Sequence, residues 1–199
     1  LPARASVVHQ TMRRLIAGGD IGRLRLLTIL QGGRRAPEPT RWDHDGAPAD
    51  ERVLHAMAAL IRHRGPDDYG SCRVSLRGGV IDTALAFHRL SILDTSERGH
   101  QPMMSQDGQV VLLFNGAIYN FPELRQELLD LGYSFWSDGD TEVLLKGYHA
   151  WGAALLPKLN GMFALAIWER DNQRLFLARD RLGVKPLYLS RNGERLRFA

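Results

Sequence analysis

The stretch VVLLFNGAIYNFPELRQELLDLG, residues 110–132, contains both kinds of regular structure expected in this chain. Its five leading apolar residues are typical of a buried β-strand over residues 110–114. Pro122 suits the first turn of a helix and Gly132 suits its end, and the four leucines between them recur at helical spacing. The stretch therefore predicts a strand that leads directly into a helix.

The segments on either side predict further strands and helices in blocks. Strands are expected at residues 73–76, 80–87, 162–168 and 174–178, with a hairpin formed by residues 186–189 and 196–199. Helices are expected from Asp50 to the turn at Gly65 and from Asp140 onward. Because strands and helices do not alternate strictly, the order favours an α+β fold of antiparallel sheets with helices packed outside them.

The distribution of charge argues against a nucleic-acid-binding protein. The chain has 199 residues, 44% of them apolar, and 26 lysines and arginines against 22 acidic residues. Residues 1–40 hold seven arginines against Asp20 and Glu38, a net charge of +5, so the other 159 residues sum to −1. A near-neutral body does not offer the basic face that phosphates require, so no nucleic-acid partner is expected.

The single cysteine, Cys72, excludes a disulfide framework and a cysteine-based zinc site. No apolar run approaches the roughly 18 residues needed to cross a bilayer, and the first residues lack the pattern of a signal peptide. We therefore expect a cytoplasmic protein without a membrane partner.

Arg89 is the first candidate for a functional residue, because it follows an apolar run and is expected at the end of a buried strand. A buried arginine needs a carboxylate partner, since an unpaired buried charge is costly. The partner is either Asp94, which would make Arg89 structural, or the carboxylate of a ligand held by two hydrogen bonds. The residues alone leave both interpretations open.

Two further segments have a structural and a functional interpretation. Asn115 and Gly116 form either a plain turn or a pair of donors, one amide and one backbone N–H, that stabilises an oxyanion. Asp140 either caps a helix or receives a substrate ammonium. Together with Arg89, these residues would suit an amino acid whose side-chain carbonyl is attacked, and glutamine fits that description. Such a site still needs a nucleophile with a nearby base.

Six short motifs occur in this order: residues 62–67 (RHRGPD), 88–92 (HRLSI), 114–120 (FNGAIYN), 138–143 (DGDTEV), 161–164 (GMFA) and 178–188 (ARDRLGVKPLY). Together they closely resemble the glutaminase domain of glutamine-dependent asparagine synthetases. The resemblance implies a class II glutamine amidotransferase domain of the N-terminal-nucleophile (Ntn) type, a four-layer αββα sandwich. In that family an N-terminal cysteine attacks the glutamine amide, its own α-amino group acts as base, and the ammonia passes to a C-terminal domain that uses ATP.

The resemblance also implies a role for each matching residue. The implied contacts with glutamine are those of Arg89, Leu90 and Leu93 with its carboxylate, Asp140 with its α-ammonium, and Asn115 and Gly116 with the oxyanion. No metal ligand and no cofactor are expected in this domain. ATP and magnesium are expected in the synthetase domain, which lies outside this sequence and would choose the acceptor, aspartate or another carboxylate.

The sequence departs from the family pattern at two places. Ala117 stands where family members commonly have a carboxylate, so one contact with glutamine is expected to be weaker. Family chains open with Met-Cys-Gly-Ile shortly before an Asp-Gly pair, whereas residues 35–41 here read RAPEPTR and hold no cysteine. Cys72 lies mid-chain without a free α-amine and is expected to be a packing residue, and Thr40 is off the family spacing.

Two explanations for the missing nucleophile stay open. Residues 1–44 are a basic leader that is not part of the domain, or the domain has lost its activity and survives as a glutamine-binding or scaffold module. We expect the first, because the Arg-, Pro- and Gly-rich residues 32–41 cannot replace a buried strand. The domain is then expected over residues 45–199, with no glutamine hydrolysis by this chain.

The expected partners are glutamine and the synthetase domain. Whether the chain also forms a homodimer stays open. Residues 96–103 and 148–152 resemble the branch that amidates N-acetylglutaminylglutamine. Residues 64–66 and 183–186 look like asparagine synthetases and disfavour a glutamine:fructose-6-phosphate amidotransferase.

Overall fold

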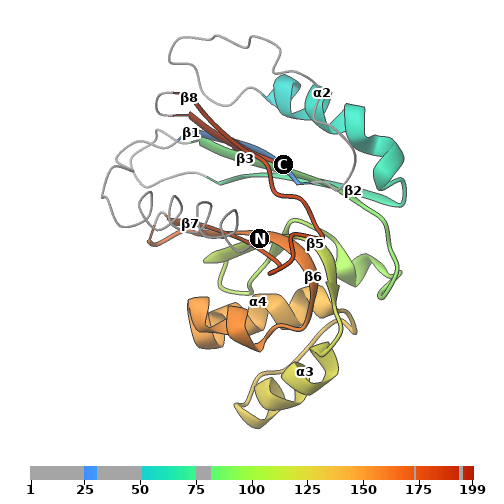
Figure 1. Ribbon diagram of the computed structural model, residues 1–199, viewed down its shortest axis with the longest axis vertical. Helices are drawn as coiled ribbons and strands as arrows, with labels where there is room; N and C mark the ends of the chain where they lie inside the picture. Colours follow the sequence, from blue (N-terminus) through green and yellow to red (C-terminus); the bar gives the residue numbers. More distant parts are fainter. Residues whose placement is uncertain (1–24, 31–50, 75–81, 173, 193–194) are drawn as a thin grey trace.

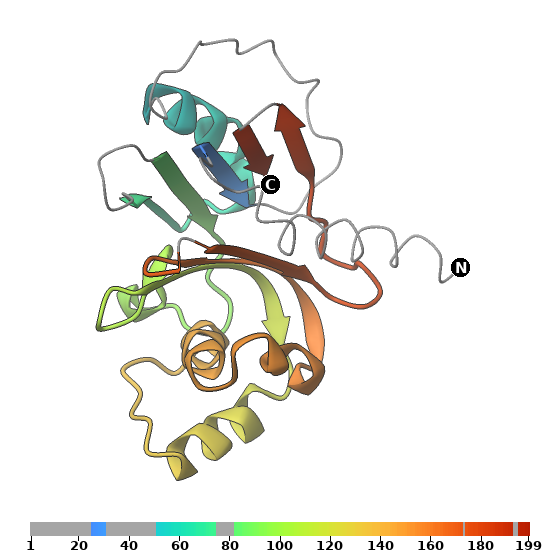
Figure 2. The same cartoon turned by 90° about the vertical axis from the view of Figure 1, so that its left-hand side faces the viewer.

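The computed structural model describes residues 25–30, 51–74, 82–172, 174–192 and 195–199 (Figure 1). Their strands form two sheets that stack face to face, and helices cover the outer face of each sheet (Figures 1 and 2). Read from top to bottom in Figure 1, the layers are helix, sheet, sheet and helix. This arrangement confirms the α+β class and the αββα sandwich that the resemblance implied.

The four-stranded sheet is antiparallel throughout. Its strands, in spatial order, are β4 (Met103–Met104), β5 (Val110–Ile118), β6 (Gly161–Glu169) and β7 (Arg174–Arg179). The chain between β5 and β6 forms α3 (Phe121–Asp130), α4 (Asp140–Trp151) and the 3-10 segment η3 (Gly152–Lys158). These helices cover the outer face of the sheet (Figure 1). Their contact with β5 and β6 buries the largest apolar cluster among the described residues.

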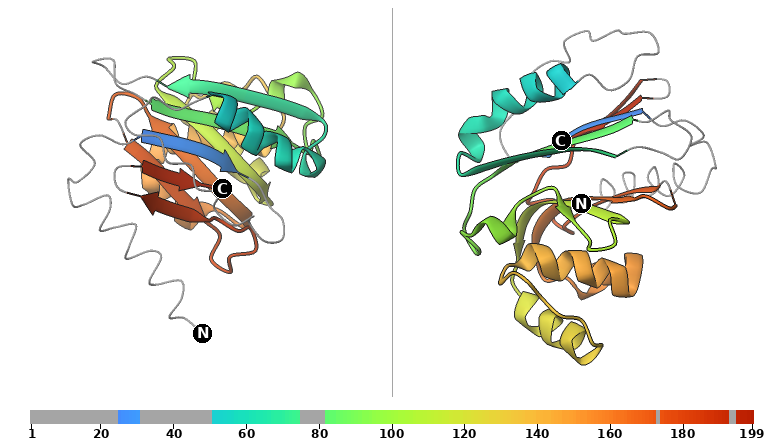
Figure 3. Two further views of the ribbon diagram at one scale, coloured as in Figure 1. Left: turned by 90° about the horizontal axis from the view of Figure 1, so that it is seen from above. Right: turned by 180° about the vertical axis from the view of Figure 1, so that it is seen from behind.

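The five-stranded sheet carries α2 (Glu51–Ile61) on its outer face (Figure 3). In spatial order its strands are β2 (Asp68–Val74), β3 (Asp82–Arg89), β1 (Arg25–Leu30), β9 (Arg195–Phe198) and β8 (Leu189–Asn192). Two 3-10 segments flank this layer: η1 (Arg62–Arg64) and η2 (Glu97–Gly99). The β2–β3 and β8–β9 pairs are antiparallel, but β1 pairs parallel with both β3 and β9, which differs from the antiparallel sheet that we expected.

The position of β1 also bears on the expected leader. Its six residues fall inside residues 1–44, which we expected to lie outside the domain, yet their backbone forms the central strand of a sheet. The apolar, β-branched sequence RLLTIL has the composition of a buried strand, which explains why it can take this place. Residues 1–24 and 31–44 lie outside the described residues, so for them the boundary stays a prediction.

The space between the two sheets is filled from both sides. Leu85 and Phe87 of β3 pack in one cluster with Val111 and Leu113 of β5. Because side chains alternate between the faces of a strand, the next residues on these faces are Arg89 and Asn115. Two of the candidate site residues therefore come from different sheets and face the same interlayer space.

Several boundaries and burial patterns differ from those expected. β5 continues to Ile118, because pairing with β6 persists as far as Gly161, so Asn115 and Gly116 lie within a strand and not in a turn. β2 begins at Asp68, before the expected start at residue 73. In α3, Leu124 and Leu128 are buried, but Leu129 and Leu131 are exposed because they lie outside the narrow face that packs on the fold. In α2, Leu60 is exposed for the same reason.

Candidate active site

One edge of β5 presents alternate backbone groups to side chains from other elements. The amide of Gln101 accepts a hydrogen bond from the N–H of Phe114 (2.7 Å) and donates one to its carbonyl (3.1 Å). Farther along, the N–H of Ile118 donates to Oδ2 of Asp140 (2.9 Å). Because alternate residues direct their backbone groups to the same edge, the N–H of Gly116 lies between these two positions. It is the donor that this edge offers to a ligand.

Gly116 is required by the approach of the neighbouring strand. A Cβ at this position would lie 2.2 Å from the carbonyl oxygen of Met162 and 2.8 Å from Cα of Phe163. Both contacts are with backbone atoms of β6, which cannot move aside as a flexible side chain could. The glycine therefore allows the free N–H to lie within a tightly paired strand.

Asn115 supplies a second donor to the same region. Its Nδ2 atom is buried and has no hydrogen-bond partner among the described residues. A buried donor without a partner costs free energy of about 1–3 kcal/mol, so such groups are rare and call for a ligand or water. The amide is thus available to an acceptor that enters between the sheets.

Arg89, at the end of β3, is buried, and its guanidinium contacts two backbone carbonyls. Nη1 donates to the carbonyl of Ser96 (3.0 Å) and Nη2 donates to that of Asp94. No described carboxylate lies within ion-pairing distance of Arg89, so, of the two interpretations left open, an ion pair with the Asp94 side chain has no support among the described residues. The Asp94 carboxylate is instead occupied by Ser96, whose N–H and hydroxyl both donate to it. The other N–H groups of Arg89 can reach a ligand carboxylate.

Asp140 begins α4 and is buried, as expected for a helix start with a second role. Burial raises the pKa of its carboxyl above the usual value, against the opposing effects of backbone N–H donors and of the Arg89 guanidinium. Arg89 thus lowers the pKa of this carboxyl, although the two groups form no ion pair. The positive charge of Arg89 and the negative charge of Asp140 would match the α-carboxylate and the α-ammonium of an amino acid.

The segment before Asp140 is held by a fully buried carboxylate, Glu142. It accepts hydrogen bonds from the N–H of Trp136 (3.0 Å) and from the N–H (2.6 Å) and hydroxyl (2.7 Å) of Ser137, and it forms an ion pair with Lys146 (2.6 Å). These contacts fix the loop that delivers Asp140 to the edge of β5.

A second buried carboxylate, Asp180, fixes the β6 strand beside Gly116. Asp180 accepts hydrogen bonds from the N–H groups of Phe163 (3.2 Å), Val184 (2.8 Å) and Lys185 (2.9 Å). Burial would raise the pKa of this carboxyl, but the backbone donors outweigh it and lower the pKa. Phe163 pairs with Gly116, so the loop after β7 supports the strand position opposite Gly116.

The structure thus brings together Arg89, Asn115, Gly116 and Asp140 from the predicted set. Leu90 and Leu93 have exposed side chains in the loop after β3, where only their backbone could contact a ligand, so their role stays a prediction. The sequence reasoning missed Gln101, because a buried glutamine before a proline forms no recognisable pattern. Glu142 stands in the DGDTEV motif, but the sequence did not predict its hydrogen bonds with Trp136 and Ser137, which precede the helix.

Cys72 has the environment of a packing residue, as expected. It is partly buried against the cluster between the sheets and pairs with Leu85, well before the end of β3 at Arg89. Burial raises the pKa of its thiol to about 11, outweighing the attraction of Arg170. Residues 35–41, where the family has its nucleophile, and Thr40 among them, lie outside the described residues.

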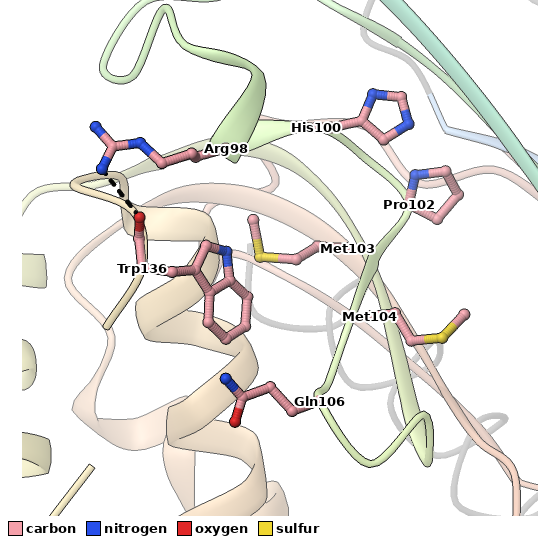
Figure 4. Close-up of a pocket in the computed structure, with 7 residues that line it drawn as sticks. All are labelled: Arg98, His100, Pro102, Met103, Met104, Gln106 and Trp136. Atoms are coloured by element: carbon pink, nitrogen blue, oxygen red, sulfur yellow. Dashed lines mark hydrogen bonds between the residues drawn. The ribbon is translucent and has the colours of Figure 1, made fainter. Parts of the chain in front are cut away.

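A hollow among the described residues lies elsewhere (Figure 4). It has a volume of about 400 Å³ and is lined by Arg98, His100, Pro102, Met103, Met104, Gln106 and Trp136. None of the predicted site residues lines it. In the described part of the chain no group of three or more His, Cys, Asp or Glu residues could hold a metal ion, and no helix is both long and apolar enough to span a membrane.

The stacked sheets place the protein in a known structural class. Glutamine phosphoribosylpyrophosphate amidotransferase from Bacillus subtilis, solved with ADP and GMP, superimposes with a TM-score of 0.58 at 22% identity, over 71% of this chain and 37% of that chain. At this identity the likeness shows the fold alone, which is that of the Ntn-type amidotransferases.

The sequence comparison is more specific. Residues 42–199 match the family described as the glutamine amidotransferase domain, and the chain belongs to this family. Asparagine synthetase (glutamine-hydrolyzing) 1 of Bacillus subtilis is 42% identical over 149 residues, which cover 75% of this chain and 22% of the relative. Asparagine synthetase (glutamine-hydrolyzing) 2 of the same organism is 38% identical over 147 residues, 74% of this chain and 18% of the relative. The chain spans about a fifth of the length of these relatives.

Proposed function

We propose that this domain binds glutamine and supplies its amide nitrogen to an ATP-dependent amidotransferase of the asparagine synthetase type. The acceptor would be an activated carboxylate such as that of aspartate. The observation that carries the proposal is an arginine and an aspartate without an ion pair, Arg89 and Asp140, beside the partnerless amide of Asn115.

The two charged groups account for recognition of the α-carbon substituents. Arg89 has N–H donors left for the α-carboxylate, and charge-assisted bonds of this kind contribute about 1.5–3 kcal/mol each. Asp140 is the matching acceptor for the α-ammonium, and its burial strengthens that attraction because water screens it less. The glutamine side chain then extends along the edge of β5 toward Gly116.

Two donors account for the chemical step. When a nucleophile attacks the side-chain carbonyl, a bond to carbon forms and negative charge moves to the oxygen. The amide of Asn115 and the N–H of Gly116 can both donate to that oxygen, and one such donor is typically worth about 10²–10³-fold in rate. The tetrahedral intermediate then collapses, and the amide nitrogen leaves with a proton as ammonia.

The contacts described above include neither the nucleophile nor the synthetase domain. In the family the nucleophile is an N-terminal cysteine, and Cys72 is the only cysteine of this sequence. We therefore expect binding without hydrolysis by this chain. The relatives are several times longer, which supports a further synthetase domain as partner, and ATP with Mg²⁺ would bind in that domain.

Calorimetry with L-glutamine tests the binding proposal. Arg89→Ala and Asp140→Ala should each weaken binding about 100-fold, because each removes an interaction of about 3 kcal/mol. Arg98→Ala is the matched control: Arg98 follows the same loop but is largely exposed and pairs with Asp138, so its loss should leave affinity within about twofold. No measurable binding by the unaltered chain would overturn the proposal and favour a scaffold module.

An ammonia-release assay tests the expectation about hydrolysis. The 199-residue chain should release no ammonia from glutamine above the background rate. Turnover that Asn115→Ala abolishes would refute this expectation and would show that another residue supplies the nucleophile.

A further inference from the structure

One residue, Asp94, contacts Arg89 and also the two residues that precede Asp140 in the chain. Its backbone carbonyl accepts a hydrogen bond from Nη2 of Arg89. Its carboxylate accepts from the N–H (2.8 Å) and hydroxyl (2.6 Å) of Ser96 through Oδ1, and from the N–H of Asp138 (3.4 Å) through Oδ2. Asp94 therefore connects the loop after β3 with the loop that precedes α4.

The contact reaches the residue next to Asp140. A Cβ placed on Gly139 would lie only 3.3 Å from Cβ of Asp94, so the Asp94 side chain packs against the backbone of Gly139. Asp94 is itself buried, with 9% of its surface exposed. The parallel link between Arg98 and Asp138 (3.4 Å) is exposed and contributes little. Asp94 is the buried connection between the two loops.

We propose that Asp94 is a positioning residue that fixes the spacing between the Arg89 guanidinium and the Asp140 carboxylate, and thereby makes the site selective for L-amino acids. This inference rests on the proposed function. The α-carboxylate and α-ammonium of one carbon atom need a cation and an anion at a set separation. The two donors on β5, the side-chain amide of Asn115 and the backbone N–H of Gly116, supply a third fixed point for the glutamine side chain. Three fixed points distinguish one enantiomer from the other.

The carboxylate is required because all three of its partners donate. An ionised carboxylate only accepts hydrogen bonds, whereas an asparagine amide also donates. In Asp94→Asn, the oxygen can keep its bonds with Ser96, but the amino group then faces the N–H of Asp138. The substitution therefore releases the Asp140 loop and leaves the contact with Arg89 in place.

The test measures L- and D-glutamine binding by calorimetry for the unaltered chain and for Asp94→Asn. We expect L-glutamine affinity to fall at least 10-fold and the L-to-D affinity ratio to fall by a similar factor. A residue that merely supports the fold would lower the melting temperature without moving this ratio.

Asp107→Asn is the matched control. Asp107 also accepts from a serine hydroxyl, that of Ser105, and from a backbone N–H, that of Gln109 (3.0 Å), but in the turn between β4 and β5. That turn adjoins the end of β5 opposite to Asn115. The control should keep the L-to-D ratio of the unaltered chain.

Each outcome decides one question. If the unaltered chain binds neither enantiomer, the proposed function fails and this inference with it. If the unaltered chain prefers L-glutamine and Asp94→Asn keeps that ratio within twofold, the role of Asp94 is refuted while the proposed function stands. Should Asp94→Asn not fold, Ser96→Ala, which removes one donor to the carboxylate, must lower the ratio by a smaller factor, and an unchanged ratio refutes the role equally.

Discussion

The two sheets of this domain are built in different ways. The four-stranded sheet comes from one continuous part of the chain and pairs each strand antiparallel with its neighbour, and large side chains fill the space beneath its helices. In the five-stranded sheet, β1 is distant in sequence from both of its neighbours and pairs parallel with them. The contact with α2 buries Leu54 against the small side chains of Ala58, Ala84 and Ala86. The strands of the first sheet lie in chain order, whereas the second sheet places a strand from the start of the chain between β3 and β9.

The candidate site residues are divided unequally between the two sheets. The proposed oxyanion donors, Asn115 and Gly116, and the proposed ammonium partner, Asp140, all lie on the four-stranded side. The five-stranded side contributes Arg89. On this side Leu30, the last residue of β1, pairs with Phe87, two residues before Arg89. The predictions that follow test whether the four-stranded side is the rigid and complete half of the site.

The largest effect is expected from Glu142→Gln. Loss of the buried charge leaves Lys146 unpaired and weakens three hydrogen bonds, so the free energy of unfolding should fall by about 4 kcal/mol, measured by urea denaturation. Glutamine affinity should fall as well, because the loop that carries Asp140 is released.

The control for this substitution is Glu169→Gln at the other end of β6. Glu169 is also buried and accepts from Tyr148, Asn172 and Arg174. It should lose comparable stability but keep its affinity for glutamine. Equal losses of affinity in both variants would mean that general loosening of the sheet, and not the Asp140 loop, controls binding.

Gly116→Ala should have the next largest effect. The new methyl group would overlap backbone atoms of Met162 and Phe163, which should lower the free energy of unfolding by about 3 kcal/mol. Gly132→Ala is the control: Gly132 has a φ of 89° but no atom within 4 Å of an added Cβ, so only backbone strain of about 1 kcal/mol is expected. Equal effects would show that the approach of β6 is not the constraint.

Asp140→Asn should change stability in the opposite direction. A carboxyl whose pKa is raised by folding binds a proton more readily in the folded state, so its ionised form opposes folding at neutral pH. The variant should therefore be more stable at pH 7, by on the order of 1 kcal/mol, and this gain should vanish below the ordinary pKa of 3.8.

The same group sets the pH dependence of binding. Glutamine affinity should decline as the pH falls, with a midpoint above 3.8, because the neutral carboxyl no longer attracts the ammonium. Asp140→Asn should bind weakly and without this dependence. A midpoint at or below 3.8 would contradict the effect of burial on this carboxyl.

Cys72→Ala, on the five-stranded side, should have the smallest effect. Stability should fall by about 1 kcal/mol or less and glutamine affinity should not change. With a thiol pKa of about 11, the cysteine of the folded chain should react with an aromatic disulfide at pH 8 at least ~100-fold more slowly than an ordinary thiol. Fast reaction or lost affinity would place Cys72 in the site.

The sequence predicted the half of the molecule in which local pattern determines structure. The helix that starts at Asp140 and the strand–helix order of residues 110–132 follow from periodicity and caps, and both were correct. The motifs gave the αββα fold and the residues that meet between the sheets. Periodicity could not place β1, because its neighbours β3 and β9 lie far from it in the sequence, and a local pattern carries no information about them. It also could not show that Asn115 and Gly116 continue a strand, because that depends on the opposite residues of β6.

The bond between Gln101 and Phe114 has a consequence for solubility. An edge strand with free backbone groups is a template on which a foreign strand can pair, and aggregation begins at such edges. On β5, Gln101 bonds to the backbone of Phe114 and Asp140 bonds to the N–H of Ile118. Between them, only the backbone groups of Gly116 stay open to another molecule. One free position admits a small ligand but is too short to pair with another chain, so this edge of β5 stays accessible without acting as a template for cross-β assembly.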